Sequence, residues 1–285
     1  MTNLLTMSGC ALKFGGLSAV NNFNLNLNEG ELVGLIGPNG AGKTCVFNLL
    51  TGIYKPEIPA FAGMTKVRHP GESRDLPRHP EESEGSRAGI YFTGVDITKL
   101  PPFKINQIGI ARTFQNIRLF NSLSVLENVR MGYHHYLKHG SLEAILRTRN
   151  YYIEEEKIYK ECLQLLKLFG LEGYIKETAK HLPYGEQRRL EIVRALATKP
   201  KLLLLDEPAA GTNPHEKREL KELIRKIRKE FNLTILLIEH DMSVVMDLCE
   251  RIVVLDHGET IAAGKPEEVR RNPKVIEAYL GEANV

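Results

Sequence analysis

The chain reads Gly37-Pro38-Asn39-Gly40-Ala41-Gly42-Lys43-Thr44 between an apolar run that ends at Ile36 and a stretch of helical spacing at residues 43–51. This order of strand, glycine-rich loop and helix matches the pattern G-x-x-x-x-G-K-[ST]. Glycines let backbone N–H groups converge on phosphate oxygens, and the N-terminus of the following helix favours negative charge. The sequence therefore predicts a phosphate-binding loop, in which Lys43 reaches the β- and γ-phosphates and the Thr44 hydroxyl ligates Mg²⁺.

A second motif supplies the carboxylates that such a loop needs. Four leucines at residues 202–205 are typical of a strand buried on both faces, and Asp206 and Glu207 follow directly. Asp206 would ligate Mg²⁺ at the end of this strand, and Glu207 would polarise the attacking water as general base. His240 follows another apolar run, residues 233–238, and would hydrogen-bond the γ-phosphate. Acidic residues after a strand also cap helices, and a lone histidine is often structural, so these assignments depend on the phosphate loop.

The last third of the chain alternates between helical and strand patterns. Helices are expected at residues 186–198, 216–230 and 243–249, and strands at 202–205, 233–238 and 252–255. This alternation predicts crossover connections and a largely parallel α/β sheet, whose ligands lie outside the carboxyl ends of the strands.

The middle of the chain, residues 123–171, has helical patterns. Ser124 and Glu127 have the spacing of an N-terminal capping pair. One apolar face is expected farther along, formed by Tyr159, Cys162, Leu163, Leu166 and Phe169.

Composition excludes several classes of protein. The chain has 285 residues and a net charge of +3, which is too small to indicate nucleic acid or an anionic membrane as the main partner. No apolar run approaches the roughly 18 residues that a membrane span needs. The N-terminus lacks the pattern of a secretory signal, and the four cysteines are far apart, so we expect a cytoplasmic protein with reduced thiols.

Residues 56–88 differ from the rest of the chain. Five of the 14 prolines fall here among mixed charges, and neither helical nor strand spacing persists. A strand pattern resumes at residues 89–92. A structureless connection of about 30 residues is unusual inside a compact domain, so we interpret residues 57–87 as an insertion.

Taken together, the motifs resemble those of ATP-binding cassette (ABC) ATPase subunits. Gln115 in an Arg-Thr-Phe-Gln run and the segment Leu182-Pro183-Tyr184-Gly185-Glu186 fall in the order seen in that family. The resemblance covers nearly the whole chain apart from residues 56–88. More narrowly, residues 209–214, 238–242 and 278–282 look like the ATPase subunits of branched-chain amino acid importers, and the lipopolysaccharide-export ATPase is a near relative.

The resemblance implies an α/β fold, a P-loop NTPase of the ABC type with a mostly parallel sheet core, an antiparallel β subdomain and a helical subdomain. Residues 1–285 would form a single ABC ATPase domain. Its RecA-like core and β subdomain would cover roughly residues 1–115 and 188–285, the helical subdomain would cover residues 116–187, and the insertion would cover residues 57–87.

The family also implies ATP and Mg²⁺ as cofactors, and roles for individual residues. Phe14 would stack on adenine, residues 37–44 would bind the phosphates, and Thr44, Gln115 and Asp206 would hold the metal. Glu207, His240 and Gln115 would be catalytic. In a head-to-tail dimer, the opposite subunit's ATP site would be completed by Leu182, Pro183, Tyr184, Gly185 and Glu186.

The sequence departs from the family's pattern in two places. Pro183 and Tyr184 replace the usual serine and first glycine of the signature segment, and proline cannot donate a hydrogen bond. Thr212 and Asn213 replace the leucine and aspartate of the loop between the two ATP sites. Because the other motif residues are present, we expect activity to be retained.

The expected function is ATP hydrolysis that powers membrane import, with branched-chain amino acids as the cargo. The expected partners are a second ABC ATPase subunit, as homodimer or heterodimer, transmembrane permease subunits and indirectly a substrate-binding protein, but no nucleic acid. The location would be the cytoplasmic face of the inner membrane. The alternatives are the ATPase of a lipopolysaccharide-type or other exporter, and a soluble ABC ATPase without a transport role. A kinase or GTPase fits less well, because neither needs residues 182–187.

Overall fold

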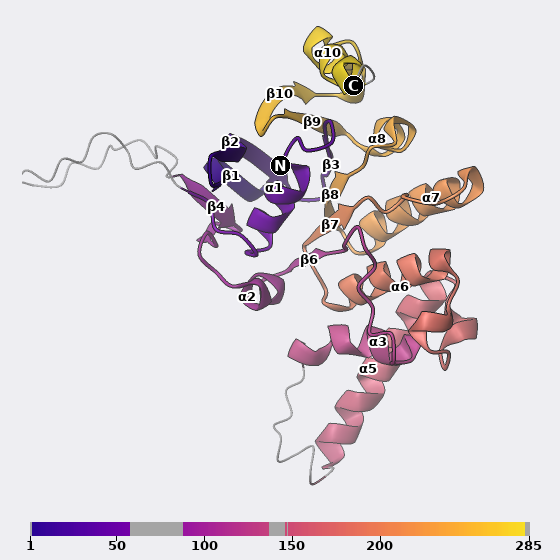
Figure 1. Cartoon of the computed structure of the whole chain (residues 1–285). Coiled ribbons are helices and arrows are strands. Elements are labelled where there is room, and N and C mark those ends of the chain that lie inside the picture. Colours follow the sequence, from indigo (N-terminus) through magenta and orange to yellow (C-terminus); the bar gives the residue numbers. More distant parts are fainter. Residues whose placement is uncertain (1, 58–87, 137–145, 147, 283–285) are drawn as a thin grey trace, which may run out of the picture.

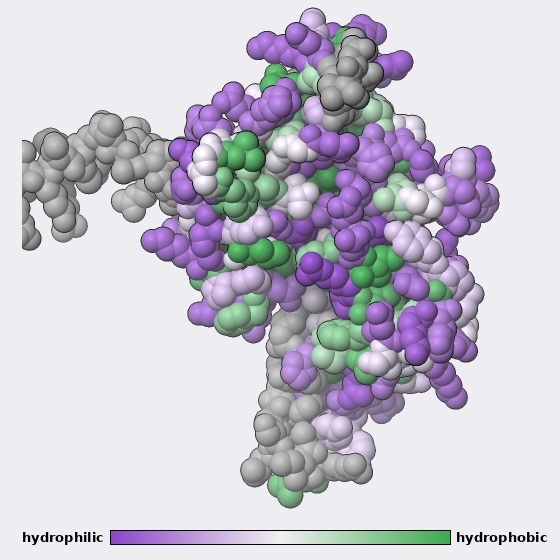
Figure 2. Space-filling model, in the orientation of Figure 1, coloured by the Kyte–Doolittle hydropathy of each residue, from purple (hydrophilic) through white to green (hydrophobic). Residues whose placement is uncertain are grey.

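The computed structural model describes residues 2–57, 88–136, 146 and 148–282 (Figure 1). The predicted insertion at residues 57–87 therefore lies outside the described residues, except for Glu57. Most of the face shown in Figure 2 is hydrophilic, and hydrophobic residues form separate patches on it. Within the described residues, no helix has the length and apolar character that crossing a membrane requires.

A six-stranded sheet forms the centre of the molecule, in the order β10-β9-β3-β8-β7-β6. Its strands are β3 (Leu32–Ile36), β6 (Ile110–Arg112), β7 (Leu202–Asp206), β8 (Thr234–Ile238), β9 (Arg251–Asp256) and β10 (Glu259–Gly264). Strands β6, β7, β8, β3 and β9 run parallel, and β10 is antiparallel to β9. The predicted largely parallel sheet is confirmed, with strand ends within one residue of those expected.

A second sheet is antiparallel and has the order β2-β1-β4-β5. Its strands are β1 (Asn3–Phe14), β2 (Leu17–Asn28), β4 (Gly89–Phe92) and β5 (Val95–Asp96). The predicted strand at residues 89–92 is confirmed as β4. The sequence pattern did not reveal β1, because several register shifts against β2 interrupt the alternation of inward and outward side chains.

Helix α1 (Lys43–Leu50) lies between the two sheets. Its apolar side chains, Phe47 among them, pack with inner residues of β1, β2 and β4 and with one face of the six-stranded sheet. The other face of that sheet is covered by α6 (Tyr184–Ala197), α7 (Pro214–Glu230), α8 (Met242–Leu248) and α9 (Pro266–Arg270). The phosphate-loop helix and α6 therefore lie on opposite faces of one sheet.

The middle of the chain is helical. Its described part contains α3 (Val125–Gly132), α5 (Arg149–Leu168) and three short turns, and it lies at the opposite end of the molecule from α10 (Pro273–Glu282) (Figure 1). Helix α2 (Pro102–Gln107) precedes β6, and the short turns are His134–Tyr136, Glu172–Tyr174 and Ala179–His181. The predicted subdomain boundary at residues 187/188 falls inside α6, which is one continuous helix.

Two local predictions for this region can be compared with the structure. The capping pair is confirmed, because the Ser124 hydroxyl accepts from the Glu127 N–H at 3.2 Å and Glu127 accepts from the Ser124 N–H at 2.7 Å. The predicted apolar face is partly wrong. Tyr159 is 47% exposed, and Ile158 takes its place beside buried Cys162 and Leu166.

The ends of the described chain around the insertion meet the same edge of β1. Glu57 pairs with Ala11, and Gly89 pairs with Ser8. Three residues along a strand span about 10 Å, so a short linker can join the two ends.

We therefore predict that replacing residues 58–87 by Gly-Gly leaves the fold and ATP hydrolysis unchanged, because Glu57 keeps its place beside Ala11. Steady-state ATPase rates and the thermal unfolding midpoint of the two proteins test this. An inactive or unfolded deletion variant would show that residues 58–87 are structural.

Candidate nucleotide site

The predicted phosphate loop follows β3 and leads into α1. At Gly37 φ is +152°, and a Cβ would lie 2.0 Å from the Leu255 carbonyl oxygen. At Gly42 φ is +101°, and a Cβ would lie 2.4 Å from the Ala19 carbonyl oxygen. No side chain fits at either position, because Leu255 of β9 and Ala19 of β2 lie directly against the backbone of the loop. Asn39 and Gly40 are exposed at its tip.

Lys43 lies buried beneath this loop. Its Nζ donates hydrogen bonds to the carbonyl oxygens of Gly37 at 2.6 Å and Pro38 at 2.8 Å. The first turn of α1 has no side-chain cap and no acidic residue, while the Thr44 side chain is exposed. Backbone N–H groups at such a helix start and a nearby ammonium group form a site for phosphate.

Sheet register brings the second motif to the same edge. Ile238 at the end of β8 pairs with Leu35 on one side and with Asp206 on the other. Neighbouring strands lie about 4.8 Å apart, so Asp206 lies roughly 10 Å across the sheet from the strand that enters the phosphate loop. The carboxyl ends of β3, β7 and β8 thus gather the predicted site residues, as expected for a parallel α/β sheet.

Asp206 is buried and paired with Arg112. The Arg112 guanidinium donates to Asp206 Oδ2 at 2.8 Å. Burial raises the pKa of the Asp206 carboxyl, and the hydrogen bond and charge of Arg112 act in the opposite direction. Arg112 begins the Arg-Thr-Phe-Gln run, but no local pattern indicates that it reaches a carboxylate 94 residues away.

Glu207, Gln115 and His240 converge at the end of β7. Gln115 Nε2 donates to Glu207 Oε2 at 2.9 Å, and His240 Nδ1 lies 3.7 Å from the same oxygen. Glu207 adopts a left-handed backbone with φ +48°, which costs a residue other than glycine roughly 1 kcal/mol or more. This unusual turn directs one carboxylate toward both partners, and the predicted catalytic residues therefore lie together.

Comparison with known proteins places this site in a family. The family described as "ABC transporter" matches residues 20–210, and "Branched-chain amino acid ATP-binding cassette transporter" matches residues 259–284. The chain belongs to the ABC transporter family. It is 45% identical to the high-affinity branched-chain amino acid transport ATP-binding protein LivG of Salmonella typhimurium and 42% identical to BraF of Pseudomonas aeruginosa, each over 98% of both chains.

Solved structures support the same assignment for this ABC protein. The ADP conformation of an ATP-binding cassette of an ABC transporter matches with a TM-score of 0.76 and 26% identity, covering 99% of this chain and 100% of the other. A nucleotide-free ATP-binding cassette matches with a TM-score of 0.75 and 25% identity, covering 98% and 99%. The predicted P-loop fold of the ABC type and the prediction of an ABC-type ATPase are confirmed.

The predicted adenine contact of the ABC protein lies at the end of β1. Phe14 is 45% exposed, and its ring meets Tyr54 edge-on at 5.2 Å between centroids. Tyr54 follows α1, so the aromatic pair lies beside the helix that begins with the phosphate loop. The exposed ring of Phe14 is available for stacking on a base.

The signature segment lies at the start of α6. Leu182 is buried, while Pro183 and Tyr184 are exposed. Proline provides no side-chain cap, so the N-terminus of this 14-residue helix keeps its N–H groups for other acceptors. The segment lies at the end of a helix on the sheet face opposite α1.

The loop after β7 has a structural role that was not predicted from the sequence. The Asn213 side chain accepts hydrogen bonds from the N–H groups of His215 and Glu216, at 2.9 and 3.0 Å, and so caps α7. Buried Glu239 accepts from the Ala209 N–H at 2.6 Å, and burial raises the pKa of Glu239. Glu239 thus ties the strand end that carries His240 to the loop after Glu207.

A buried pair on α6 holds the segment around Gln115. Arg188 donates to the carbonyl oxygens of Phe114 at 2.6 Å and Gln115 at 2.9 Å. Glu191 accepts from the N–H groups of Phe114 at 3.3 Å and Arg118 at 3.1 Å. Because of these hydrogen bonds, a movement of α6 would also shift the backbone around Gln115. Helical spacing places Arg188 and Glu191 on one face, but this role was not predicted from the sequence.

Proposed function

We propose that this chain is the ATP-hydrolysing subunit of an importer for branched-chain amino acids. The observation that carries the ATPase assignment is the meeting of Gln115 and Glu207 at the strand end beside the phosphate loop. The cargo is inferred from LivG and BraF, whose names state branched-chain amino acid transport.

In this proposal the phosphates of ATP lie over residues 37–44. Backbone N–H groups of the loop and of the first turn of α1 bind phosphate oxygens, and Lys43 exchanges its bonds to two loop carbonyls for the β- and γ-phosphates. Phe14 stacks on the adenine ring. The exposed tip of the loop leaves the other side of the phosphates open to a second subunit.

The chain offers a fitting set of donors for Mg²⁺. Thr44, Gln115 and Asp206 contribute hydroxyl, amide and carboxylate oxygens, which are the hard ligands that Mg²⁺ prefers. Arg112 bonds only Oδ2 of Asp206 and leaves Oδ1 outside that ion pair. When bound, the metal neutralises charge on the phosphate oxygens.

Hydrolysis depends on positioning. Glu207 accepts a proton from the attacking water, Gln115 orients that water through its contact with Glu207, and His240 hydrogen-bonds the γ-phosphate. His240 is 60% exposed, so it can reach a ligand that binds above the sheet edge.

A second ATPase subunit completes the site. Signature residues 182–186 lie at the N-terminal end of α6, across the sheet from α1, which supports contact with a partner's nucleotide rather than their own. The exposed N-terminus of α6 retains backbone donors for that contact, although Pro183 supplies none. A solved dimer of a bacterial ABC transporter cassette shares the fold at 24% identity, with a TM-score of 0.69 and coverage of 92% of this chain and 99% of that one.

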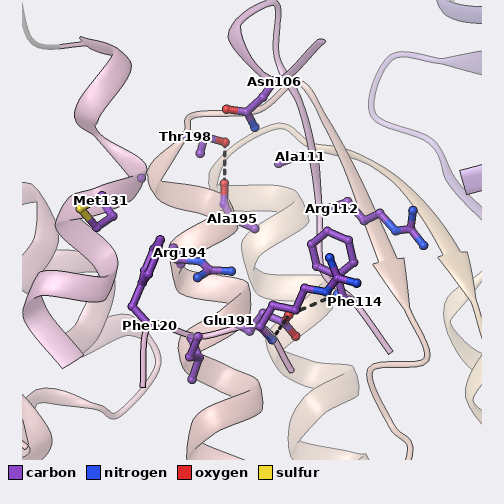
Figure 3. Close-up of a pocket in the computed structure, with 13 residues that line it drawn as sticks. Asn106, Ala111, Arg112, Phe114, Phe120, Met131, Glu191, Arg194, Ala195 and Thr198 are labelled. Atoms are coloured by element: carbon purple, nitrogen blue, oxygen red, sulfur yellow. Dashed lines mark hydrogen bonds between the residues drawn. The ribbon is translucent and has the colours of Figure 1, made fainter. Parts of the chain in front are cut away.

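The permease is proposed to dock in a pocket of about 510 Å³ between α3, α6 and the segment after β6 (Figure 3). Exposed Met131 and Phe120 provide apolar contacts, and Arg194 lies over the Phe120 ring at 5.4 Å. The pocket also contains Glu191 and Phe114, whose hydrogen bond helps to hold the segment around Gln115. A permease helix seated here would sense the nucleotide through that segment, and a substrate-binding protein would act on the permease from the other side of the membrane.

The experiment is purification of the tagged full-length chain from membranes in mild detergent, followed by mass spectrometry of the bound proteins. We expect multi-spanning permease subunits of an amino acid importer, and fewer of them with Met131→Glu than with Ile276→Glu, which changes an exposed residue of α10 at the opposite end of the molecule. An exporter permease would support the exporter alternative. Absence of any membrane partner would support the soluble ATPase and place the chain away from the cytoplasmic membrane face.

A further inference from the structure

The Arg112 side chain joins three elements around the metal carboxylate. Its Nη1 donates to Asn48 Oδ1 of α1 at 2.6 Å, and its Nη2 donates to Asp206 Oδ2 of β7 at 2.8 Å. The guanidinium also lies over the rings of Phe47 and Phe114, at 5.3 and 5.1 Å from their centroids. Forked hydrogen bonds and two aromatic rings fix this cation in one orientation.

The two hydrogen bonds of Arg112, to Asn48 and to Asp206, form a fork that joins the two elements that supply metal ligands. Thr44 and Asn48 are one helical turn apart on α1 and so lie on the same face of that helix. Asp206 is at the end of β7. The charge of Arg112 therefore lies between the helix of one metal ligand and the carboxylate of another.

While no metal is bound, the guanidinium of Arg112 balances the negative charge of Asp206. The Arg112 and Asp206 side chains are 5% and 3% exposed, so water can solvate neither charge well. A buried carboxylate without a partner is strongly unfavourable, and a nearby divalent cation would relieve it. Arg112 provides that compensation already, and its positive charge opposes a second cation at the same carboxylate.

We propose that Arg112 is a built-in counter-cation that keeps Asp206 from capturing Mg²⁺ ahead of the nucleotide. The inference rests on the proposed role of Asp206 as a metal ligand. The phosphates of ATP bring enough negative charge to outweigh Arg112, so the metal enters with the nucleotide. Arg112 is thus a positioning residue for Asp206, and it makes metal binding conditional on ATP.

The test is metal binding by Arg112→Gln in the absence of nucleotide. Mn²⁺, followed by electron paramagnetic resonance, serves as the probe, and thermal unfolding is measured with and without millimolar Mg²⁺. We expect Arg112→Gln to bind Mn²⁺ more than about tenfold tighter than the original chain, because the repulsion between cations is removed. Its unfolding midpoint should be several degrees lower without metal and should rise with Mg²⁺, while that of the original chain stays unchanged.

Three control variants isolate the charge. Asn48→Ala removes the other half of the fork but keeps the ion pair, so Mg²⁺ alone should not stabilise it. Arg112→Lys keeps a cation near Asp206 and should also show no response. The double variant Arg112→Gln, Asp206→Asn lacks the carboxylate and should lose the response of the single variant. Sodium chloride at equal ionic strength controls for screening.

Equal or weaker Mn²⁺ binding by Arg112→Gln would show that Arg112 is merely structural, and so would an equal response in Asn48→Ala. If Arg112→Gln does not fold without metal, it should be recovered folded when Mg²⁺ is present during refolding, and failure in both conditions overturns the proposal. ATP hydrolysis by the original chain is measured in parallel. Its absence would contradict the proposed function, whereas hydrolysis without the metal response contradicts only this inference.

Discussion

Replacing Glu207 by Gln is expected to lower kcat for ATP hydrolysis by a factor of about 10² to 10⁴, with ATP binding retained. The amide has the shape of the carboxylate and can still bond Gln115, which lies 2.9 Å away, but it cannot accept a proton from water. Because ATP stays bound, the ATP-loaded dimer should accumulate. Phosphate release measures kcat, and size-exclusion chromatography in ATP and Mg²⁺ measures the dimer.

The matched control is Glu222→Gln, the same change at an exposed position on α7. It should hydrolyse ATP at the original rate. Turnover by Glu207→Gln at the level of this control would remove Glu207 as the general base. His240, whose Nδ1 lies 3.7 Å from the Glu207 carboxylate, would then be the next candidate for the general base.

Replacing Lys43 by Met is expected to abolish measurable hydrolysis and to weaken ATP binding at least about tenfold. Charge-assisted hydrogen bonds to phosphate are among the strongest available to a protein, and Met keeps an unbranched side chain, one atom shorter, without its donors. The carbonyl oxygens of Gly37 and Pro38 lose a partner, so a loss of about 1 kcal/mol in unfolding free energy is also expected.

Equilibrium dialysis with labelled ATP measures the binding, and urea unfolding measures the stability. Lys229→Met on the exposed side of α7 is the control and should match the original chain in both. ATP affinity in Lys43→Met equal to that of the control would show that residues 37–44 do not hold the phosphates.

Motifs that act through local backbone geometry could be predicted from the sequence. The phosphate loop needs glycines at particular positions, and the close approach of Leu255 and Ala19 to Gly37 and Gly42 shows why. The strand ending at Asp206 could be predicted from four consecutive leucines, because a strand buried on both faces needs apolar residues throughout.

Contacts between distant segments could not be predicted in the same way. The fork of Arg112 joins residues 48, 112 and 206, and its geometry depends on how the sheet and α1 pack. The left-handed turn at Glu207 likewise leaves no residue signal, since glycine or asparagine would be the usual choice there. The Asn213 side chain also caps α7, a role that the resemblance did not indicate.

The helical region shows a third kind of limit. An apolar face read from spacing alone can be displaced by one residue, as happened at Tyr159 and Ile158 on α5. Tyrosine has an apolar ring and a polar hydroxyl, so its place on a helix face depends on whether neighbouring helices cover it. Packing of α5 against α3 and α6 decides this, and the sequence pattern does not contain that information.

The role in branched-chain amino acid import is tested most directly by measuring the uptake of radiolabelled leucine in cells of the source organism that lack the gene for this chain. We predict that uptake is lost, that the original chain restores it, and that Glu207→Gln produced at the same level does not. Undiminished leucine uptake without the chain, or full restoration by Glu207→Gln, would contradict the assignment of this protein as the ATPase of a branched-chain amino acid importer.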